Sequence, residues 1–227
     1  MHDTIYELTT AELFSDASES VLQSAPPRLY CRGDVGLLKR TIRVSIIGSR
    51  NASPEGVKRS QRLAKILASE SIVVVSGLAQ GIDTAAHAAA LNSHGKTIAV
   101  IGTAIDKYYP CENRSLQERI ATDGLLVSQF NIGTMTTASN FVRRNLTMAM
   151  LSHATVVIEA TETSGTIHQC REMIRLGRQV FFLRSLAESN VSWVRKMIRD
   201  GAKVLGNDNM GDLLGLFSGG GSVSCRK

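Results

Sequence analysis

Three short segments have the composition with which proteins bind phosphate groups. They are Gly48-Ser49-Arg50, the stretch 76–83 ("SGLAQGID") and Ser164-Gly165-Thr166. Glycine lets a backbone approach a ligand closely, hydroxyls donate to anionic oxygens, and arginine offers two parallel donors. A helix beginning in such a segment adds free N–H groups and the positive end of its dipole. A fourth segment, 102–113, also follows an apolar run.

The alternative is that these glycines only form tight turns and that the serines and threonines only cap helices. Either explanation suffices for one segment alone. Four such segments at one edge of a sheet favour an anion site.

A second basic element is the stretch 140–152, "NFVRRNLTMAMLS". Arg143, Arg144 and Asn145 stand near the start of an amphipathic helical pattern. Two arginines in a first turn oppose the helix dipole, which suggests that an anion binds there. The alternative is that both are solvated surface arginines.

Asp83 and His87 are four residues apart and share one face of a predicted helix. They could be two metal ligands, or a base and the group that orients it. No third ligand has a suitable spacing, so we favour a structural pair and expect no metal, no cofactor and no catalytic residue. The Walker, G-x-G-x-x-G, H-E-x-x-H and G-x-S-x-G motifs are also missing from the sequence.

The elements that position these residues follow a regular alternation. Short, continuously apolar runs, typical of strands buried on both faces, alternate with amphipathic helical stretches. This predicts an α/β fold with a doubly wound, mainly parallel sheet and helices on both faces. The ligand of such a sheet binds beyond the carboxyl ends of its strands. The predicted strands are 44–47, 72–76, 97–101, 125–128, 155–159 and 179–183, and the predicted helices are 54–69, 81–93, 114–122, 140–152, 166–176 and 190–200.

The totals suit one α/β domain with short appendages. The chain has 227 residues, 43% of them hydrophobic, and a net charge of +6. Residues 1–40 form an acidic lead-in, residues 41–215 the domain, and residues 216–227 a flexible tail. The positive charge of the domain is compatible with a polyanionic partner.

The cysteines stand at positions 31, 111, 170 and 225, too far apart for a C-x-x-C pair. Isolated thiols indicate a reducing compartment, so we expect a cytoplasmic protein. We identify no signal peptide and no apolar run of membrane-spanning length.

Seven segments in order resemble the DNA processing protein A family, also called DprA or Smf. They are "GSRNASPEG", "VVSGLAQGIDTAAHAAAL", "TIAVIGTAIDKYYPCEN", "NFVRRN", "VIEATETSGT", "GRQVFF" and "IRDGAKVL". The resemblance covers about residues 29–214. It implies a Rossmann-like domain that binds single-stranded DNA, protects incoming DNA in natural transformation and passes it to the RecA recombinase, as a homodimer.

The same resemblance implies which residues contact DNA. The implied positions are Gly48, Ser49, Arg50, Ser76, Gly77, Gln80, Gly81, Arg143, Arg144 and Asn145, to which we add the anion-site residues Ser164, Gly165 and Thr166. Leu146 replaces the second arginine of the family's F-P-x-R-N-R pattern. The flanking helical domain and the winged-helix module of many members have no room in 227 residues, which predicts a core-only version.

Two other functions remain open from the sequence. One is a phosphoribohydrolase on a related fold, whose P-G-G-x-G-T-x-x-E motif resembles "TETSGTIHQ". Here Glu162 and Thr163 replace the glycine pair and Gln169 replaces the glutamate, and an amide cannot act as a general base. The other is a nucleotide-sensing domain that signals to a partner. The aromatic residues nearest the anion site are Tyr108, Tyr109 and Phe141, and we expect each to belong to the core.

Overall fold

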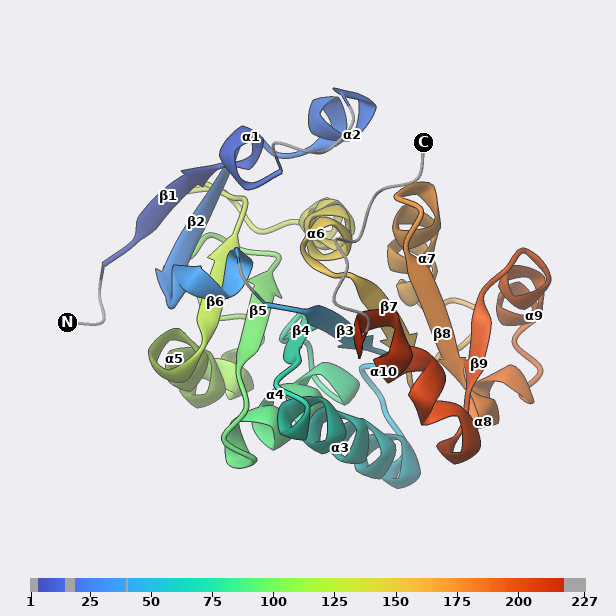
Figure 1. Ribbon diagram of the computed structural model, residues 1–227. Helices are drawn as coiled ribbons and strands as arrows, with labels where there is room; N and C mark the ends of the chain where they lie inside the picture. Colours follow the sequence, from blue (N-terminus) through green and yellow to red (C-terminus); the bar gives the residue numbers. More distant parts are fainter. Residues whose placement is uncertain (1–3, 15–18, 40, 219–227) are drawn as a thin grey trace.

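The computed structural model describes residues 4–14, 19–39 and 41–218. Within these residues, nine strands form a single sheet. Their bounds are β1 (Tyr6–Thr9), β2 (Arg28–Gly33), β3 (Arg43–Ile47), β4 (Val73–Ser76), β5 (Thr97–Ile101), β6 (Leu125–Ser128), β7 (Ala154–Val157), β8 (Gln179–Leu183) and β9 (Lys203–Leu205). Their order in space is β1-β2-β6-β5-β4-β3-β7-β8-β9 (Figure 1).

The sheet is doubly wound, as the alternation of strands and helices predicts. From β3 the chain adds β4, β5 and β6 on one side, and later returns to add β7, β8 and β9 on the other. The pairs β6–β5, β5–β4, β4–β3, β3–β7, β7–β8 and β8–β9 are all parallel. The pairs β1–β2 and β2–β6 are antiparallel. The strand order therefore reverses between β3 and β7, and such a switch point is where open α/β sheets bind their ligands.

Helices cover both faces of this sheet. The longer ones are α3 (Pro54–Ser69), α4 (Ile82–Asn92), α5 (Arg114–Asp123), α6 (Ala138–Leu151), α7 (Thr166–Arg175), α9 (Ser192–Arg199) and α10 (Met210–Ser218). The shorter ones are α1 (Thr10–Leu13), α2 (Glu19–Ser24), α8 (Arg184–Ala187) and the 3₁₀ turns η1 (Val35–Leu38), η2 (Cys111–Asn113) and η3 (Asn207–Asn209).

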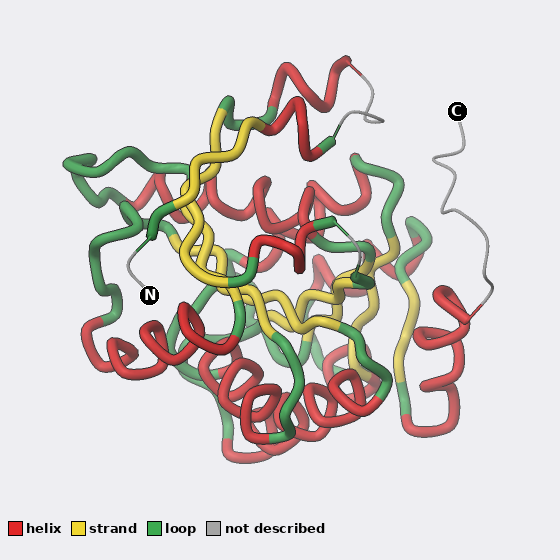
Figure 2. Tube along the Cα trace, turned by 60° about the vertical axis from the view of Figure 1, so that its left-hand side comes forward, coloured by secondary structure: helices red, strands yellow, loops and turns green. Residues whose placement is uncertain are grey.

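Successive strand residues point into opposite halves of the core. Val74 belongs to the hydrophobic cluster that includes α3, α4 and α10, whereas Val73 and Val75 belong to the cluster that includes α6, α7 and α9. Figure 2 shows the strands as a layer between helices on both sides. Burial on both faces explains why these strands are continuously apolar rather than alternating.

The six predicted strands and six predicted helices all form, with ends shifted by no more than two residues. The sequence pattern did not reveal β1, β2 or β9. Strands β1 and β2 lie within residues 1–40, which therefore belong to the sheet. Of the predicted tail, residues 216–218 end α10, and residues 219–227 lie outside the described residues.

Two features concern membrane-spanning helices and the cysteine thiols. No described helix has the length and apolar character needed to cross a membrane. Cys31, Cys111 and Cys170 are free thiols, and Cys225 lies outside the described residues. Burial raises the pKa of the Cys31 and Cys170 thiols to about 12, so both are unreactive in the folded protein.

Candidate functional site

A cavity of about 740 Å³ lies at the switch point of the sheet, and we call it the switch-point cavity. Its walls come from the segments after β3 and β7 and from the start of α6, with Ala79 and Asp83 after β4 and Tyr109 after β5. Eight of the predicted site residues line it: Gly48, Ser49, Arg50, Arg144, Asn145, Ser164, Gly165 and Thr166. The topology thus brings together residues from three segments distant in the sequence.

The segment after β3 reaches the cavity because Gly48 allows a close backbone approach. A Cβ atom at Gly48 would lie 2.7 Å from Cγ1 of Ile82 and 2.9 Å from the carbonyl oxygen of Glu159. The Ser49 N–H donates to that same carbonyl at 2.9 Å, which ties the segment to the end of β7. The tight approach presents Arg50 at the mouth of the cavity.

Arg50 is an exposed cation without a counter-ion among the described residues. Its guanidinium carbon lies 5.5 Å from the ring centroid of Phe141, within cation–π range. The side chain is therefore oriented by an aromatic ring while its donors stay available to a ligand.

Arg144 supplies a second, buried cation. Its Nη1 atom donates to the carbonyl oxygens of Gly77 and Val100, each at 2.6 Å, and Nε donates to Oδ1 of Asn145 at 3.2 Å. Nη2 makes no hydrogen bond within the described part of the chain. Burial, opposed by the charge of Asp83 and assisted by that of Arg50, lowers the pKa of Arg144 to about 10, and the group stays protonated at neutral pH.

Asp83 stabilises the segment that follows β4, next to Arg144. Its carboxylate accepts the N–H groups of Gly77 at 3.1 Å and Ala79 at 3.3 Å. Burial raises the pKa of Asp83, and the charge of Arg144 opposes that rise. Since Asp83 and Arg144 are both buried, the two charges compensate each other.

The predicted contacts after β4 have structural roles instead of lining the cavity. Ser76 is fully buried and donates to the carbonyl of Ile46 at 2.6 Å. Gly77 leaves the space that Arg144 fills, and Gly81 adopts a φ of +77° against the carbonyl oxygen of Ser49. Gln80 is exposed, and none of the four lines the switch-point cavity.

Helices α6 and α7 begin at residues that line the cavity, and α3 begins three residues after Asn51, which also lines it. The N-terminus of α3 is occupied, because the Ser53 N–H and hydroxyl both donate to the Glu159 carboxylate, at 3.1 Å and 2.7 Å respectively. The N-cap residue of α7, Gly165, makes no side-chain capping bond, and Ser164 and Thr166 share a hydroxyl contact of 2.8 Å. The positive ends of the α6 and α7 dipoles are therefore the ones without a side-chain cap, although the Ile167 and His168 N–H groups of α7 donate to backbone carbonyls at 3.4 Å and 3.2 Å.

The adjacent arginines of α6 point in different directions. Arg143 is exposed and lies over the ring of Phe130, 5.5 Å from its centroid, away from the cavity. Successive residues of a helix are about 100° apart, so Arg143 and Arg144 point to different sides of α6. Asn145 is half-buried and does line the cavity.

Asp83 and His87 are structural but do not pair with each other. The Nδ1 atom of His87 lies 2.7 Å from the hydroxyl of Thr97, and burial lowers the pKa of this imidazole to about 3. The side chain is therefore neutral in the folded protein. The described residues contain no group of three or more acidic, histidine or cysteine side chains suited to a metal ion.

The prediction that the nearby aromatic residues belong to the core is wrong for Tyr109. Its exposed fraction is 48%, and its ring centroid lies 5.1 Å from that of Phe141. Both residues line the cavity, whereas Tyr108 donates to Glu118 elsewhere. Within the predicted segment 102–113, only Tyr109 lines the cavity, and Gly102 packs directly beneath Phe141.

Several lining residues carry no signal in the sequence. Asn51, Thr136, Thr137 and Thr161 line the cavity from loops, and His168 lines it from the first turn of α7. Gln169 also lines it, 1% exposed, and its Oε1 has no hydrogen-bond partner. The cavity therefore combines two cations, an open helix N-terminus and an aromatic pair, with an amide at the place of the hydrolases' glutamate.

The model of the family described as DNA recombination-mediator protein A matches residues 8–215. The chain is similar to DNA processing protein DprA of Streptococcus pneumoniae, with 39% identity over 187 residues, 82% of this chain and 66% of that protein. It is also similar to Protein Smf of Synechocystis, with 34% identity over 83% of this chain and 48% of the relative. The chain thus spans less than two thirds of either relative.

Solved structures agree with these matches. DNA processing protein A of Helicobacter pylori superposes with a TM-score of 0.80 at 26% identity, covering 94% of this chain and 98% of the other. The Streptococcus pneumoniae protein gives a TM-score of 0.75 at 33% identity, covering 90% and 72%. A molybdenum cofactor binding protein of Rippkaea orientalis, with a TM-score of 0.57 at 15% identity over 78% of this chain and 97% of the other, shares the fold alone.

Proposed function

Because this chain belongs to the DNA recombination-mediator protein A family, we propose that it binds single-stranded DNA in the switch-point cavity and acts as a recombination mediator. The Helicobacter pylori relative has a single-stranded DNA binding mode. The observation that carries the proposal is the convergence of Arg50, Arg144 and the uncapped α7 N-terminus on one cavity. Arg50 has no counter-ion among the described residues, so a phosphate would supply the missing charge.

A strand bound there has its phosphate and its bases in different surroundings. The phosphate meets Arg50 and the N–H groups at the start of α7. A base meets the ring face of Tyr109 or Phe141, which lie at the same mouth. Aromatic faces stack on every base, so we expect affinity with little sequence preference.

The proposal extends to the setting of this activity. We propose that the protein is cytoplasmic, forms a homodimer and passes DNA to RecA in natural transformation or recombination. Its domain spans residues 41–215, joined through β6 to the strands of residues 1–40. These points rest on the family and on the fold that the chain shares with it.

We propose no hydrolysis of nucleotides. Gln169 lies in the cavity where a general base would be required, and an amide does not accept a proton at neutral pH. His168 also lines the cavity, but no described carboxylate contacts it to orient it as a base. A cavity of this size would admit a free nucleotide, so nucleotides belong in the test.

The test is fluorescence anisotropy with a labelled 20-mer of thymidines, the same length of duplex, and nucleoside monophosphates as competitors. We expect tight binding of the single strand, weaker binding of the duplex and no competition by micromolar nucleotide. A duplex that binds as tightly as the single strand, or a nucleotide that displaces it at micromolar concentration, would overturn the proposal. Chromatography of the same mixtures for free base tests the absence of hydrolysis.

A further inference from the structure

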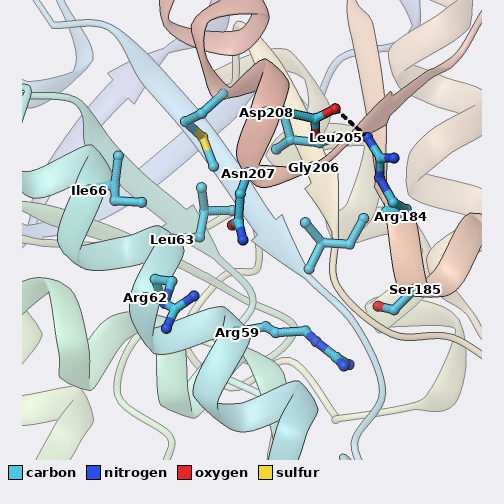
Figure 3. Close-up of a pocket in the computed structure, with 12 residues that line it drawn as sticks. Arg59, Arg62, Leu63, Ile66, Arg184, Ser185, Leu205, Gly206, Asn207 and Asp208 are labelled. Atoms are coloured by element: carbon cyan, nitrogen blue, oxygen red, sulfur yellow. Dashed lines mark hydrogen bonds and ion pairs between the residues drawn. The ribbon is translucent and has the colours of Figure 1, made fainter.

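A second cavity, of about 380 Å³, lies beside α3 where β8 and β9 end, and we call it the α3 cavity (Figure 3). Its floor is apolar. Leu63 and Ile66 come from α3, Leu183 and Leu205 end β8 and β9, and Met210 begins α10. The α3 cavity shares no lining residue with the switch-point cavity.

The rim of the α3 cavity is basic. Arg59 and Arg62 extend from α3 on one side, and Arg184 stands on the other, bound to Asp208 (Figure 3). Nη2 of Arg184 donates to both carboxylate oxygens, at 2.7 Å and 2.8 Å. Arg59 and Arg62 have no ion pair or hydrogen bond to any described residue. An anion would therefore bind on the α3 side of the rim.

Arg184 has a different function from the two arginines of α3. Asp208 compensates its charge and fixes the plane of its guanidinium group. A fixed guanidinium plane stacks well on a flat conjugated ring. The apolar floor, the planar group and the two free cations together fit a ligand with a flat base and an attached phosphate.

Helix α3 connects the two cavities. Arg50 and Asn51, just before the helix, line the switch-point cavity, and Arg59, five residues after Pro54, lines the α3 cavity. Five residues of helix span about 7.5 Å. At about 3.4 Å per nucleotide in a stacked strand, about two nucleotides cover the length of this helical segment.

We propose, on the basis of the proposed function, that a DNA strand leaving the switch-point cavity continues along α3 and places one base in the α3 cavity. The base lies on the floor of Leu63 and Leu205 beside Arg184, and the phosphates bind Arg59 and Arg62. An acidic peptide and a second copy of this chain are the other candidate occupants. The continuity along α3 with the first site favours the strand.

The test compares oligonucleotides of 5 and 15 thymidines by anisotropy. The variant Arg59→Ala/Arg62→Ala removes the two free cations. The matched control, Lys58→Ala/Lys65→Ala, removes two charges from the same helix at exposed positions that line neither cavity. We expect the Arg59/Arg62 variant to bind the 15-mer at least about tenfold more weakly, to bind the 5-mer as the wild type does, and to lose about 1.4 from the salt slope of the 15-mer.

Each contrary outcome has a distinct meaning. If the Arg59/Arg62 variant and the lysine control bind the 15-mer equally, the α3 cavity holds no DNA. The same conclusion follows if the variant loses affinity for both lengths by the same factor. Unchanged DNA binding with a changed mass in light scattering would assign the cavity to contacts between copies. Failure of the wild type to bind either oligonucleotide would instead refute the proposed function, and this inference with it.

Discussion

Replacing Arg50 with alanine separates DNA binding from folding. Arg50 is exposed, and within the described part of the chain its guanidinium forms no ion pair and lies 5.5 Å from the ring centroid of Phe141. Such an exposed cation–π contact contributes about 0.5–1 kcal/mol to stability, so the variant should unfold close to the wild-type urea midpoint. The switch-point cavity, by contrast, loses an exposed cation that has no counter-ion among the described residues.

The size of the binding defect follows from the bonds that are lost. A hydrogen bond to a charged group contributes about 1.5–3 kcal/mol, and each 1.4 kcal/mol is tenfold in Kd. We therefore expect Arg50→Ala to weaken binding of single-stranded DNA by about 10- to 150-fold. Losing one phosphate contact should also reduce the slope of log K against log salt by about 0.7.

The assay is anisotropy with a labelled 20-mer over a salt series, with Arg199→Ala as the control. Arg199 is an exposed arginine near the end of α9 and lines neither cavity. Arg50→Lys keeps the charge without the paired donors and should fall between the wild type and Arg50→Ala. Equal Kd values for Arg50→Ala and Arg199→Ala, or an unchanged salt slope, would refute the reasoning.

Three further predictions concern the surroundings of Arg50. Arg144→Ala should lower the free energy of unfolding by about 3–5 kcal/mol in urea titrations, because it leaves Asp83 as an uncompensated buried charge; a midpoint within error of the wild type would contradict this. Stability should decrease as pH falls from 6.5 towards about 3, because unfolding lets His87 gain a proton that its folded-state pKa of about 3 excludes; thermal melts of His87→Leu over the same range should show a shallower decrease. Gly165→Asp should keep or slightly raise the melting temperature, since nothing lies within 4 Å of the added Cβ, and should abolish DNA binding by placing a carboxylate at the α7 N-terminus. Undiminished affinity in that variant would mean that the phosphate binds elsewhere.

Most strands and helices could be predicted because their signals in the sequence are local. Continuous apolar runs identify the buried strands, and Ser53 with Pro54 identifies the start of α3. Strand β1 is mostly exposed and β9 has three residues, so neither produces a strong pattern. Their places in the sheet depend on pairing with β2 and β8, which is a long-range effect.

The site could be predicted only in outline. The arginines and glycines at the strand ends can be identified in the sequence. Whether each hydrogen-bond donor is free or already bonded depends on residues that are distant in the sequence. Glu159 occupies the N-terminus of α3 from 106 residues away, and the backbone of Gly77 and Val100 holds Arg144 in place. The predicted segments before α3 and α7 therefore look alike in sequence, and only the fold shows that the N-terminus of α3 is occupied.

The burial of Arg144 beside the exposed Arg50 has a genetic consequence. Alleles that alter Arg50 should accumulate as full-length, inactive protein, because the fold does not depend on that side chain. Alleles that alter Arg144 should instead disappear from cell extracts, because a destabilised chain is degraded by proteases. A transdominant phenotype, in which the defective product interferes with a normal copy, should therefore arise at position 50 and not at position 144.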